Sequence, residues 1–430
     1  MSQQQVSPAQ QLIGSIELAP DKSIAQRAAI FSLLHEGTST IENFSPAQDP
    51  QSTLSCVAKL GAKVDIDQSI VRIEGVGRDG IKAEINELDC GNSGTAMRLL
   101  SGVLVGAGIP VTLIGDPSLS SRTMTRIIKP LEQMGAHILA RNSAYAPLFI
   151  TREDPLVPMD FRLPIPSAQL KSCILLAGLF GEEPTRVIES IPSRDHTERL
   201  LQLPVSELHG ERIIEASKHI EIPAQNYRIP GDYSAAAFWL VAGSIVPNSE
   251  IQLPHVGLNP TRTASLKILQ EMGANISIET HSESFAEPVG TLTVTSSALK
   301  AFDIPVEWIP NAIDELPILA VAMAFAEGTS HIRGAEELRH KETDRIMAIA
   351  QLLQAIGAHF RELPDGLEII GNPNLEFESA TFESYHDHRI AMASAVASLR
   401  GSKSSLIHDA EAAAVSYPDF WTHLGALSAN

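Results

Sequence analysis

Six short segments of the sequence place helix-capping residues directly before an apolar, alanine-rich run. They are Lys22-Ser23, Gly91 to Thr95, Ser167 to Gln169, Gly231 to Ser234, Ile313 to Glu315 and His386 to Arg389. Ser, Thr, Asn and Asp accept hydrogen bonds from the free N–H groups of a helix start, so capping explains each segment taken singly. Taken together, six helix starts with partial positive charge are suited to binding phosphate or carboxylate groups. The sequence therefore predicts a site for small anions.

Fixed cations recur near a second set of helices. They are Arg122 in SLSSRTMTR, Arg194 in PSRDHTER, and Lys341 and Arg345 in RHKETDR. Arginine binds carboxylate and phosphate through two parallel hydrogen bonds, which makes it well suited to anionic substrates. In HKETDR the alternating charges could equally be ion pairs on a helix surface, and the residues alone leave both explanations open.

Two acids open one apolar helix in the segment IDELP. Asp314 can cap that helix, and a carboxylate near a group of cations is also a candidate general base. His386 and His388 have no third ligand at an obvious spacing, so we predict no metal site. The three cysteines form no CxxC pair and are expected to be reduced and buried.

The composition limits the possible partners. The chain has 430 residues, 44% of them hydrophobic, which allows two domains of about 200 residues each. A net charge of −19 and a pI near 5.2 repel nucleic acid and anionic membranes, so we expect neither as a partner. The start MSQQQVSPAQQ lacks the pattern of a signal peptide, and we expect a cytoplasmic protein.

Two types of helix alternate along the chain. Alanine-rich stretches, each followed by a turn and a β-branched strand, begin at Arg27, Thr95, Gln169, Ser234, Leu316 and Arg389. Stretches of the second type end in Gly-Ala before a strand, at Gly61, Gly135, Gly273, Gly357 and Gly425, and one copy without glycine lies near Pro204. Glycine suits the left-handed position that ends a helix. The pattern predicts an α/β fold of β-α-β-α-β-β repeats, three in each of two domains.

The repeats also predict where the domains divide. We expect the chain to cross between them near residues 14–22 and 227–238, so that residues 1–18 and 231–430 form one domain and 19–230 the other. The active site is then expected in the cleft between the domains. A solenoid is less well supported, because known solenoid repeats span about 20–50 residues.

At this point the chain resembles the enolpyruvyl transferases, and in particular the branch that acts on shikimate 3-phosphate. The motifs that carry the resemblance are PDKSIAQRA, GNSGTAMRLLSG, GDPSLSSRTM, SAQLKSCILLAGL, SRDHTERLL, IPGDYSAAAF, NPTRTASL, IDELPILAVAMAFAEG, EELRHKETDRI and DHRIAMA. They run from end to end and are together highly specific. The resemblance implies two inside-out α/β barrels that close over the substrates.

The resemblance also implies a reaction. The 5-hydroxyl of shikimate 3-phosphate is joined to C2 of phosphoenolpyruvate and inorganic phosphate is released, on the pathway to chorismate and aromatic amino acids. This chemistry needs an acid, a base and cations, but neither a metal nor an organic cofactor. The two substrates are the expected partners, and a monomer is the default expectation.

Site residues carry over position by position. For shikimate 3-phosphate the resemblance assigns Lys22, Ser23, Arg27, Ser167, Ala168, Gln169, Arg194, Asp314 and Lys341. For phosphoenolpyruvate it assigns Lys22, Gly94, Arg122, Gln169, Arg345 and Arg389. Asp314 would deprotonate the 5-hydroxyl, Glu342 would protonate the methylene carbon, and Lys22 would assist the proton transfers. We expect Asp49 to support Lys22 or the wall of the cleft.

Some positions separate this chain from its relatives. Val415 replaces a lysine that contacts phosphoenolpyruvate in some members, and together with SAQ and GNSGT it resembles the second class of the branch. Members of that class can resist glyphosate through alanine at the position of Gly94, so Gly94 predicts sensitivity. KS in place of KN, and no cysteine between Gly115 and Arg122, disfavour the sister enzyme that acts on UDP-N-acetylglucosamine. The intact charged residues disfavour an inactive scaffold, and the pI disfavours an RNA-processing enzyme.

Overall fold

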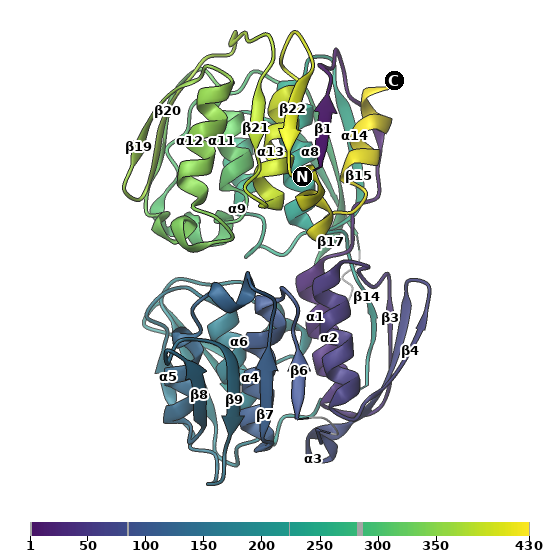
Figure 1. The fold of residues 1–430 in the computed structure, drawn as a ribbon, viewed down its shortest axis with the longest axis vertical. Coiled ribbons are helices and arrows are strands. Elements are labelled where there is room, and N and C mark those ends of the chain that lie inside the picture. Colours follow the sequence, from purple (N-terminus) through teal and green to yellow (C-terminus); the bar gives the residue numbers. More distant parts are fainter. Residues whose placement is uncertain (1, 84–85, 223, 282–286, 430) are drawn as a thin grey trace. The chain divides into compact units, whose positions relative to one another are not determined.

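The computed structural model describes residues 2–83, 86–222, 224–281 and 287–429, which form a mixed α/β structure (Figure 1). The chain divides into two compact units. Unit 1 comprises Met1–Ala19, Pro230–Glu283 and Pro288–Asn430, and unit 2 comprises Pro20–Ile229 with Ser284–Glu287. The boundaries predicted from the sequence follow residues 18 and 230, whereas in the structure the chain passes from one unit to the other after Ala19 and after Ile229. Each unit has its own hydrophobic core.

Unit 2 contains three four-stranded sheets with one shared topology. In each sheet the first two strands in spatial order are parallel and the remaining pairs are antiparallel. In spatial order the sheets are β14 (Asn226–Arg228), β3 (Glu36–Glu42), β5 (Ile70–Val76) and β4 (Lys63–Asp67); β6 (Glu87–Asp89), β7 (Val111–Ile114), β9 (Tyr145–Thr151) and β8 (His137–Arg141); and β10 (Asp160–Arg162), β11 (Thr185–Glu189), β13 (Glu211–Ala216) and β12 (Val205–Leu208).

Two helices belong to each sheet of unit 2. The first-type helices are α1 (Lys22–Leu33), α4 (Gly94–Ala107) and α6 (Ala168–Gly178), and the second-type helices are α2 (Gln48–Lys59), α5 (Thr125–Gln133) and α7 (His196–Leu200). The first-type helices are buried along most of their length, because their apolar residues lie on every side. Short helices α3 (Gly77–Gly80) and η1 (Leu119–Ser121) complete unit 2.

Unit 1 repeats the same plan with two incomplete sheets. Its sheets, again in spatial order, are β16 (Asn275–Thr280), β17 (Val289–Thr295), β15 (Glu250–Gly257) and β2 (Ile13–Ser15); β18 (Gly328–Ile332), β20 (Gly366–Gly371) and β19 (His359–Leu363); and β1 (Gln3–Val6), β22 (Ser405–His408) and β21 (Thr381–Glu383). Its helices are α8 (Tyr233–Ile245), α9 (Ala264–Glu271), α10 (Ile309–Ala312), α11 (Leu316–Ala324), α12 (Arg345–Ala355), α13 (His388–Ser398) and α14 (Phe420–Ser428), with 3-10 turns η2 (Val306–Trp308), η3 (Glu336–His340) and η4 (Ala410–Val415).

The predicted α/β repeat is confirmed, but the predicted barrel is not. The described strands form six separate sheets of three or four strands, and none of these sheets closes on itself. Each small sheet can bury one face against its helices, so closure is not required to form a core. Three of the sheets are completed by distant strands, because β14 pairs with β3, β2 pairs with β15 and β1 pairs with β22.

The glycines that end the second-type helices behave as expected with one exception. Four of the five predicted positions have positive φ and follow a helix: Gly61, Gly135, Gly273 and Gly357. Gly425 instead lies inside α14, and no described strand follows it, so this prediction is wrong. In the copy without glycine, Gln202 takes a positive φ of 50° just after α7.

No described helix is both long and apolar enough to cross a membrane. The apolar run from Leu99 to Gly115 forms helix α4, a turn and strand β7, because Gly108 ends the helix with a left-handed backbone.

The close packing of α4 against α6 generates a stability prediction. A Cβ atom at Gly102 would lie 2.1 Å from the carbonyl oxygen of Cys173, so Gly102→Ala should destabilise unit 2 by about 3 kcal/mol. Gly425→Ala is the matched control, because this helical glycine has no heavy atom within 4 Å of the added Cβ, and alanine should stabilise there by about 0.5–1 kcal/mol. Urea unfolding midpoints measure both changes. Equal midpoints for the two variants would contradict the close approach.

Candidate active site

In unit 2 the starts of the three first-type helices are joined by polar side chains. Asp21 caps α1, Ser93 caps α4 and Ser167 caps α6. The cap of α1 is therefore Asp21 rather than the predicted pair Lys22-Ser23. Ser93 Oγ donates to Gln26 Oε1 at 2.7 Å, which links α4 to α1.

Gln169 and Gly94 lie at neighbouring helix starts. Gln169 Nε2 donates to Thr95 Oγ1 at 3.0 Å, and Arg98 donates to Gln169 Oε1 at 2.6 Å. Gly94 is the first residue of α4 and Ala168 the first of α6. Arg98 lies within the motif GNSGTAMRLLSG, although it was not among the predicted site residues.

Lys22 is held at the first turn of α1. Its Nζ lies 3.4 Å from Asp49 Oδ2 of α2, with 21% and 13% of the two side chains exposed. Ser23 is the next residue of the same turn and is half-buried. Lys22 thus has a fixed partner while part of its side chain remains exposed.

Arg27 is buried and its guanidinium is anchored within unit 2. It donates to Thr197 Oγ1 at 2.9 Å, to the Ser23 carbonyl at 3.1 Å and to Ser172 Oγ at 3.2 Å. Burial lowers the pKa of Arg27 to about 10, although the charge of Asp21 opposes this shift. The positive charge of Arg194 also lowers that pKa.

Arg122 is oriented by the loop that precedes α4. Its guanidinium donates to Asn92 Oδ1 at 2.8 Å and to Ser118 Oγ at 3.1 Å. Asn92 in turn donates to Asp116 Oδ2 at 2.7 Å. Asn92 belongs to the segment GNSGT, so this motif fixes Arg122 as well as capping a helix.

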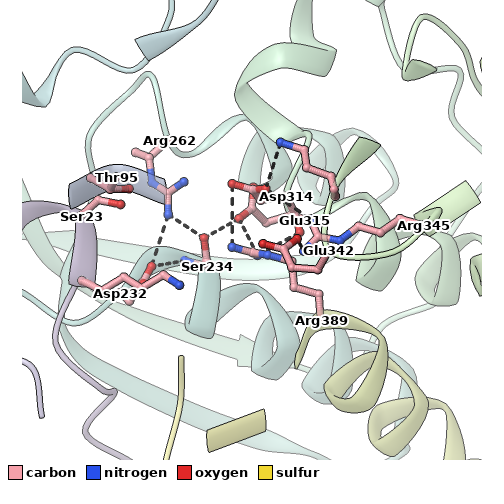
Figure 2. Close-up of polar contacts among 12 residues, drawn as sticks. Ser23, Thr95, Asp232, Ser234, Arg262, Asp314, Glu315, Glu342, Arg345 and Arg389 are labelled. Atoms are coloured by element: carbon pink, nitrogen blue, oxygen red, sulfur yellow. Dashed lines mark hydrogen bonds and ion pairs between the residues drawn. The ribbon is translucent and has the colours of Figure 1, made fainter. Parts of the chain in front are cut away.

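In unit 1 the carboxylate of Asp314 is surrounded by three cations (Figure 2). Oδ1 lies 3.4 Å from Arg345 and 3.8 Å from Lys341, and Oδ2 lies 3.8 Å from Arg389. The prediction that Asp314 caps α11 is wrong, because Glu315 occupies the cap position and makes no capping hydrogen bond through its side chain. The Asp314 carboxylate is therefore held by these three cations and not by the N–H groups of a helix start.

Arg345 joins this carboxylate to two others. Its guanidinium donates to Asp387 Oδ2 at 2.7 Å and to Glu342 Oε2 at 2.6 Å, and only 1% of its side chain is exposed. Burial alone would lower the pKa of Arg345, but the charges of Asp387, Glu342 and Asp314 outweigh burial and raise it. Burial alone would raise the pKa of Asp387, but the charges of Arg345 and His388 and the hydrogen bond from Arg345 together outweigh burial and hold that pKa below its usual value.

Hydrogen bonds and an ion pair connect Arg262 to Arg389 through buried polar side chains (Figure 2). Arg262 donates to Ser234 Oγ at 2.5 Å, and Ser234 donates to Glu315 Oε1 at 2.5 Å. The same oxygen of Glu315 lies 3.5 Å from Arg389, whose guanidinium also donates to the Asp314 carbonyl at 2.9 Å. Arg262 lies in the motif NPTRTASL, but no role was predicted for it, because its partners are distant along the chain.

The predicted site residues are divided between the two units, and the predicted set for each substrate has members in both. Unit 1 brings together Asp314, Lys341, Glu342, Arg345 and Arg389. In unit 2, an ion pair joins Lys22 to Asp49, and hydrogen bonds join Ser23 to Arg27 and Gln169 to Thr95. Within the described ranges no group of His, Cys, Asp and Glu side chains could hold a metal ion.

Known proteins are similar to this one over almost the whole chain. The family model of EPSP synthase (3-phosphoshikimate 1-carboxyvinyltransferase) matches residues 6–424. The chain belongs to the EPSP synthase family. Its sequence is 50% identical to the 3-phosphoshikimate 1-carboxyvinyltransferase of Salinibacter ruber, over 99% of both chains, and 48% identical to that of Gloeobacter violaceus, over 98% of both. The family resemblance inferred from the motifs is thus confirmed.

Solved structures agree with this family. An EPSP synthase from Acinetobacter baumannii superposes with a TM-score of 0.88 at 37% identity, covering 100% of this chain and 98% of that one. The enolpyruvyl transferase NikO from Streptomyces tendae has a TM-score of 0.76 at 15% identity, over 98% of this chain and 96% of the other. The second similarity shows that the fold is shared.

The lowered pKa of Asp387 predicts an acid-dependent loss of stability. A carboxyl group with a lowered pKa in the folded protein stabilises the fold above its unfolded value near about 3.9, and loses this effect as the pH falls towards its folded value. Asp387→Asn should therefore be less stable than the wild type at pH 7, with a difference that shrinks between about pH 5 and pH 3. Urea unfolding across this range measures the difference.

Glu378→Gln is the control, because Glu378 pairs with Lys403 where 75% and 66% of the side chains are exposed. It should remain close to the wild type throughout. If the difference in unfolding free energy between Asp387→Asn and the wild type stays constant down to pH 3, then Arg345 does not help to lower the pKa of Asp387.

Proposed function

We propose that this protein transfers the enolpyruvyl group of phosphoenolpyruvate to the 5-hydroxyl of shikimate 3-phosphate and releases inorganic phosphate. The observation that carries the proposal is the Asp314 carboxylate, surrounded by Lys341, Arg345 and Arg389, with Glu342 on the same arginine. Membership of the EPSP synthase family supports it. Such a site offers a base, an acid and cations for substrates that carry phosphate and carboxylate groups.

Asp314 is proposed as the general base. Three cations lie within 4 Å of its oxygens, and opposite charges at this range favour the ionised form that a base requires. Asp314 would take the proton of the 5-hydroxyl as the hydroxyl oxygen forms a bond to C2 of phosphoenolpyruvate. Because the carboxylate is held by three side chains, its position before the reaction is fixed.

Glu342 is proposed as the acid. It would protonate the methylene carbon as the new C–O bond forms, which gives a tetrahedral intermediate. The ionised Glu342 then takes a proton back from the same carbon while the bond between C2 and the phosphate oxygen breaks, which restores the enol double bond and releases phosphate. Lys22 would neutralise the bridging oxygen as it leaves with the phosphate.

The remaining site residues are proposed to bind the two substrates. Ser23, Arg27, Ser167, Ala168, Gln169, Arg194 and Lys341 would hold shikimate 3-phosphate. Gly94, Arg122, Gln169, Arg345 and Arg389 would hold phosphoenolpyruvate. We also propose that the protein acts as a monomer in the cytoplasm and needs no cofactor.

Phosphate release tests the proposed function. With phosphoenolpyruvate present, the protein should release phosphate when shikimate 3-phosphate is added and should not do so with UDP-N-acetylglucosamine. Release with the UDP-sugar would favour the sister reaction, and release with neither acceptor would favour an inactive scaffold. Either result would overturn the proposal.

Asp314 provides the most direct test of the mechanism. Asp314→Asn keeps the shape of the side chain but removes the base, so kcat should fall at least about 100-fold. Glu378→Gln, which neutralises an exposed carboxylate paired with Lys403, should leave kcat unchanged. Turnover of Asp314→Asn within about tenfold of the wild type would show that another group is the base.

Gly94 predicts the response to glyphosate. A hydrogen atom in place of a methyl group leaves space at the start of α4, so glyphosate should compete with phosphoenolpyruvate at sub-millimolar concentration. A Cβ at Gly94 would lie 2.8 Å from an Arg98 nitrogen, and Gly94→Ala should weaken inhibition by about tenfold or more. Gly425→Ala is the control. Steady-state inhibition constants measure the effect, and equal constants for all three proteins would contradict it.

A further inference from the structure

A buried group of charged side chains lies beneath the segment that carries Arg194. Lys171 of α6 is 0% exposed, and its Nζ donates to both oxygens of Glu189 at 3.1 Å and to Glu198 Oε1 at 2.7 Å. Arg212 of β13 adds a second cation, 3.0 Å from Glu189 Oε1. We call Lys171, Glu189, Glu198 and Arg212 the Lys171 cluster. None of the four was assigned a role above.

Such a cluster is not explained by stability alone. Removing charges from water is costly, and apolar residues of similar volume often stabilise a protein as well as a buried ion pair does. What an ionic cluster adds is direction, because each hydrogen bond fixes the position of the group at its other end. The groups at the other end of these bonds therefore indicate the role of the cluster.

The cluster holds Ser193 by three hydrogen bonds. The Ser193 amide donates to Glu189 Oε2 at 3.1 Å, the hydroxyl donates to the same oxygen at 2.9 Å, and the carbonyl accepts from Lys171 Nζ at 3.3 Å. Arg194 is the next residue. On its other side, Asp195 lies 2.8 Å from Arg199 and 4.0 Å from Arg212. Both neighbours of Arg194 are thus fixed by buried or half-buried charges.

The adjacent residue of α6 anchors Arg27. Ser172 Oγ lies 2.7 Å from Thr197 Oγ1, and Arg27 donates to both hydroxyl groups, at 3.2 and 2.9 Å. Lys171 and Ser172 together therefore connect one turn of α6 to Arg194 and to Arg27. Both arginines are proposed ligands of shikimate 3-phosphate and not of phosphoenolpyruvate, for which Arg345 and Arg389 of unit 1 and Lys22, Gly94, Arg122 and Gln169 of unit 2 are proposed.

We propose that Lys171 is a positioning residue for shikimate 3-phosphate, which acts through Glu189 and Ser193 to fix the backbone on which Arg194 is carried. The proposal rests on the proposed function. Lys171 itself is fully buried, so it would act through its neighbours and not by touching a substrate. Its removal should therefore weaken the binding of one substrate and leave the other unaffected.

Steady-state kinetics with Lys171→Met test this role. The KM for shikimate 3-phosphate should rise by about tenfold or more, while the KM for phosphoenolpyruvate stays within about twofold of the wild type. Lys171→Arg keeps the charge and should restore part of the loss. Ser193→Ala removes one hydrogen bond without leaving a buried charge unpaired, and it should raise the same KM by a smaller factor.

Arg186→Met is the matched control. Arg186 lies on β11 like Glu189 and pairs with Glu215 of β13 at 3.1 Å, but both side chains are about a third or more exposed. This variant should leave both KM values unchanged. Equal increases in the two KM values of Lys171→Met, or an unchanged KM for shikimate 3-phosphate in both Lys171→Arg and Ser193→Ala, would overturn the proposal. If Lys171→Met does not fold, the KM values of Lys171→Arg and Ser193→Ala decide.

Calorimetric titration with shikimate 3-phosphate separates the two proposals. A wild type that binds shikimate 3-phosphate but releases no phosphate from phosphoenolpyruvate would overturn the proposed function alone. The dissociation constants of the same variants would then decide the role of Lys171. The constant for shikimate 3-phosphate should be largest for Lys171→Met, smaller for Ser193→Ala and smallest for the wild type. Equal dissociation constants would overturn it.

Discussion

The burial of one guanidinium organises the candidate site of unit 1. Arg345 is 1% exposed, and its charge is balanced by Asp387, Glu342 and Asp314 at 2.7, 2.6 and 3.4 Å. A buried charge must be paired and hydrogen-bonded, so these carboxylates cannot be placed independently of one another. The proposed base and acid therefore share a fixed reference point, although Glu342 remains 29% exposed.

Helix starts provide the second constraint. In both units the first-type helices are largely apolar on all sides, so they must be buried, and their charged side chains lie within the first two turns. Caps such as Ser93 and Asp387 satisfy the free N–H groups there, and the neighbouring residues carry the charges. This arrangement explains how a protein with a net charge of −19 can gather cations locally.

The sequence predicted what depends on local pattern and missed what depends on tertiary pairing. Alternating helix types and terminal glycines gave the repeats, because capping and periodicity act within a few residues. The prediction that Gly425 ends a helix was wrong, because an identical Gly-Ala pair is tolerated inside a helix when nothing requires a turn. Lys171 and Arg262 were not found, because their partners lie 18 or more residues away and only folding brings them together. For the same reason Asp314 was expected to cap a helix, whereas three cations hold it.

A double-mutant cycle between Arg345 and Asp387 tests the central claim most directly. The values of kcat/KM for Arg345→Met, Asp387→Asn and the combined variant would be compared with the wild type. If the two residues act as one unit, the combined loss will be smaller than the sum of the single losses by more than about 1.4 kcal/mol. Losses that add to within about 0.5 kcal/mol would show that Arg345 and Asp387 act independently, and would contradict the account.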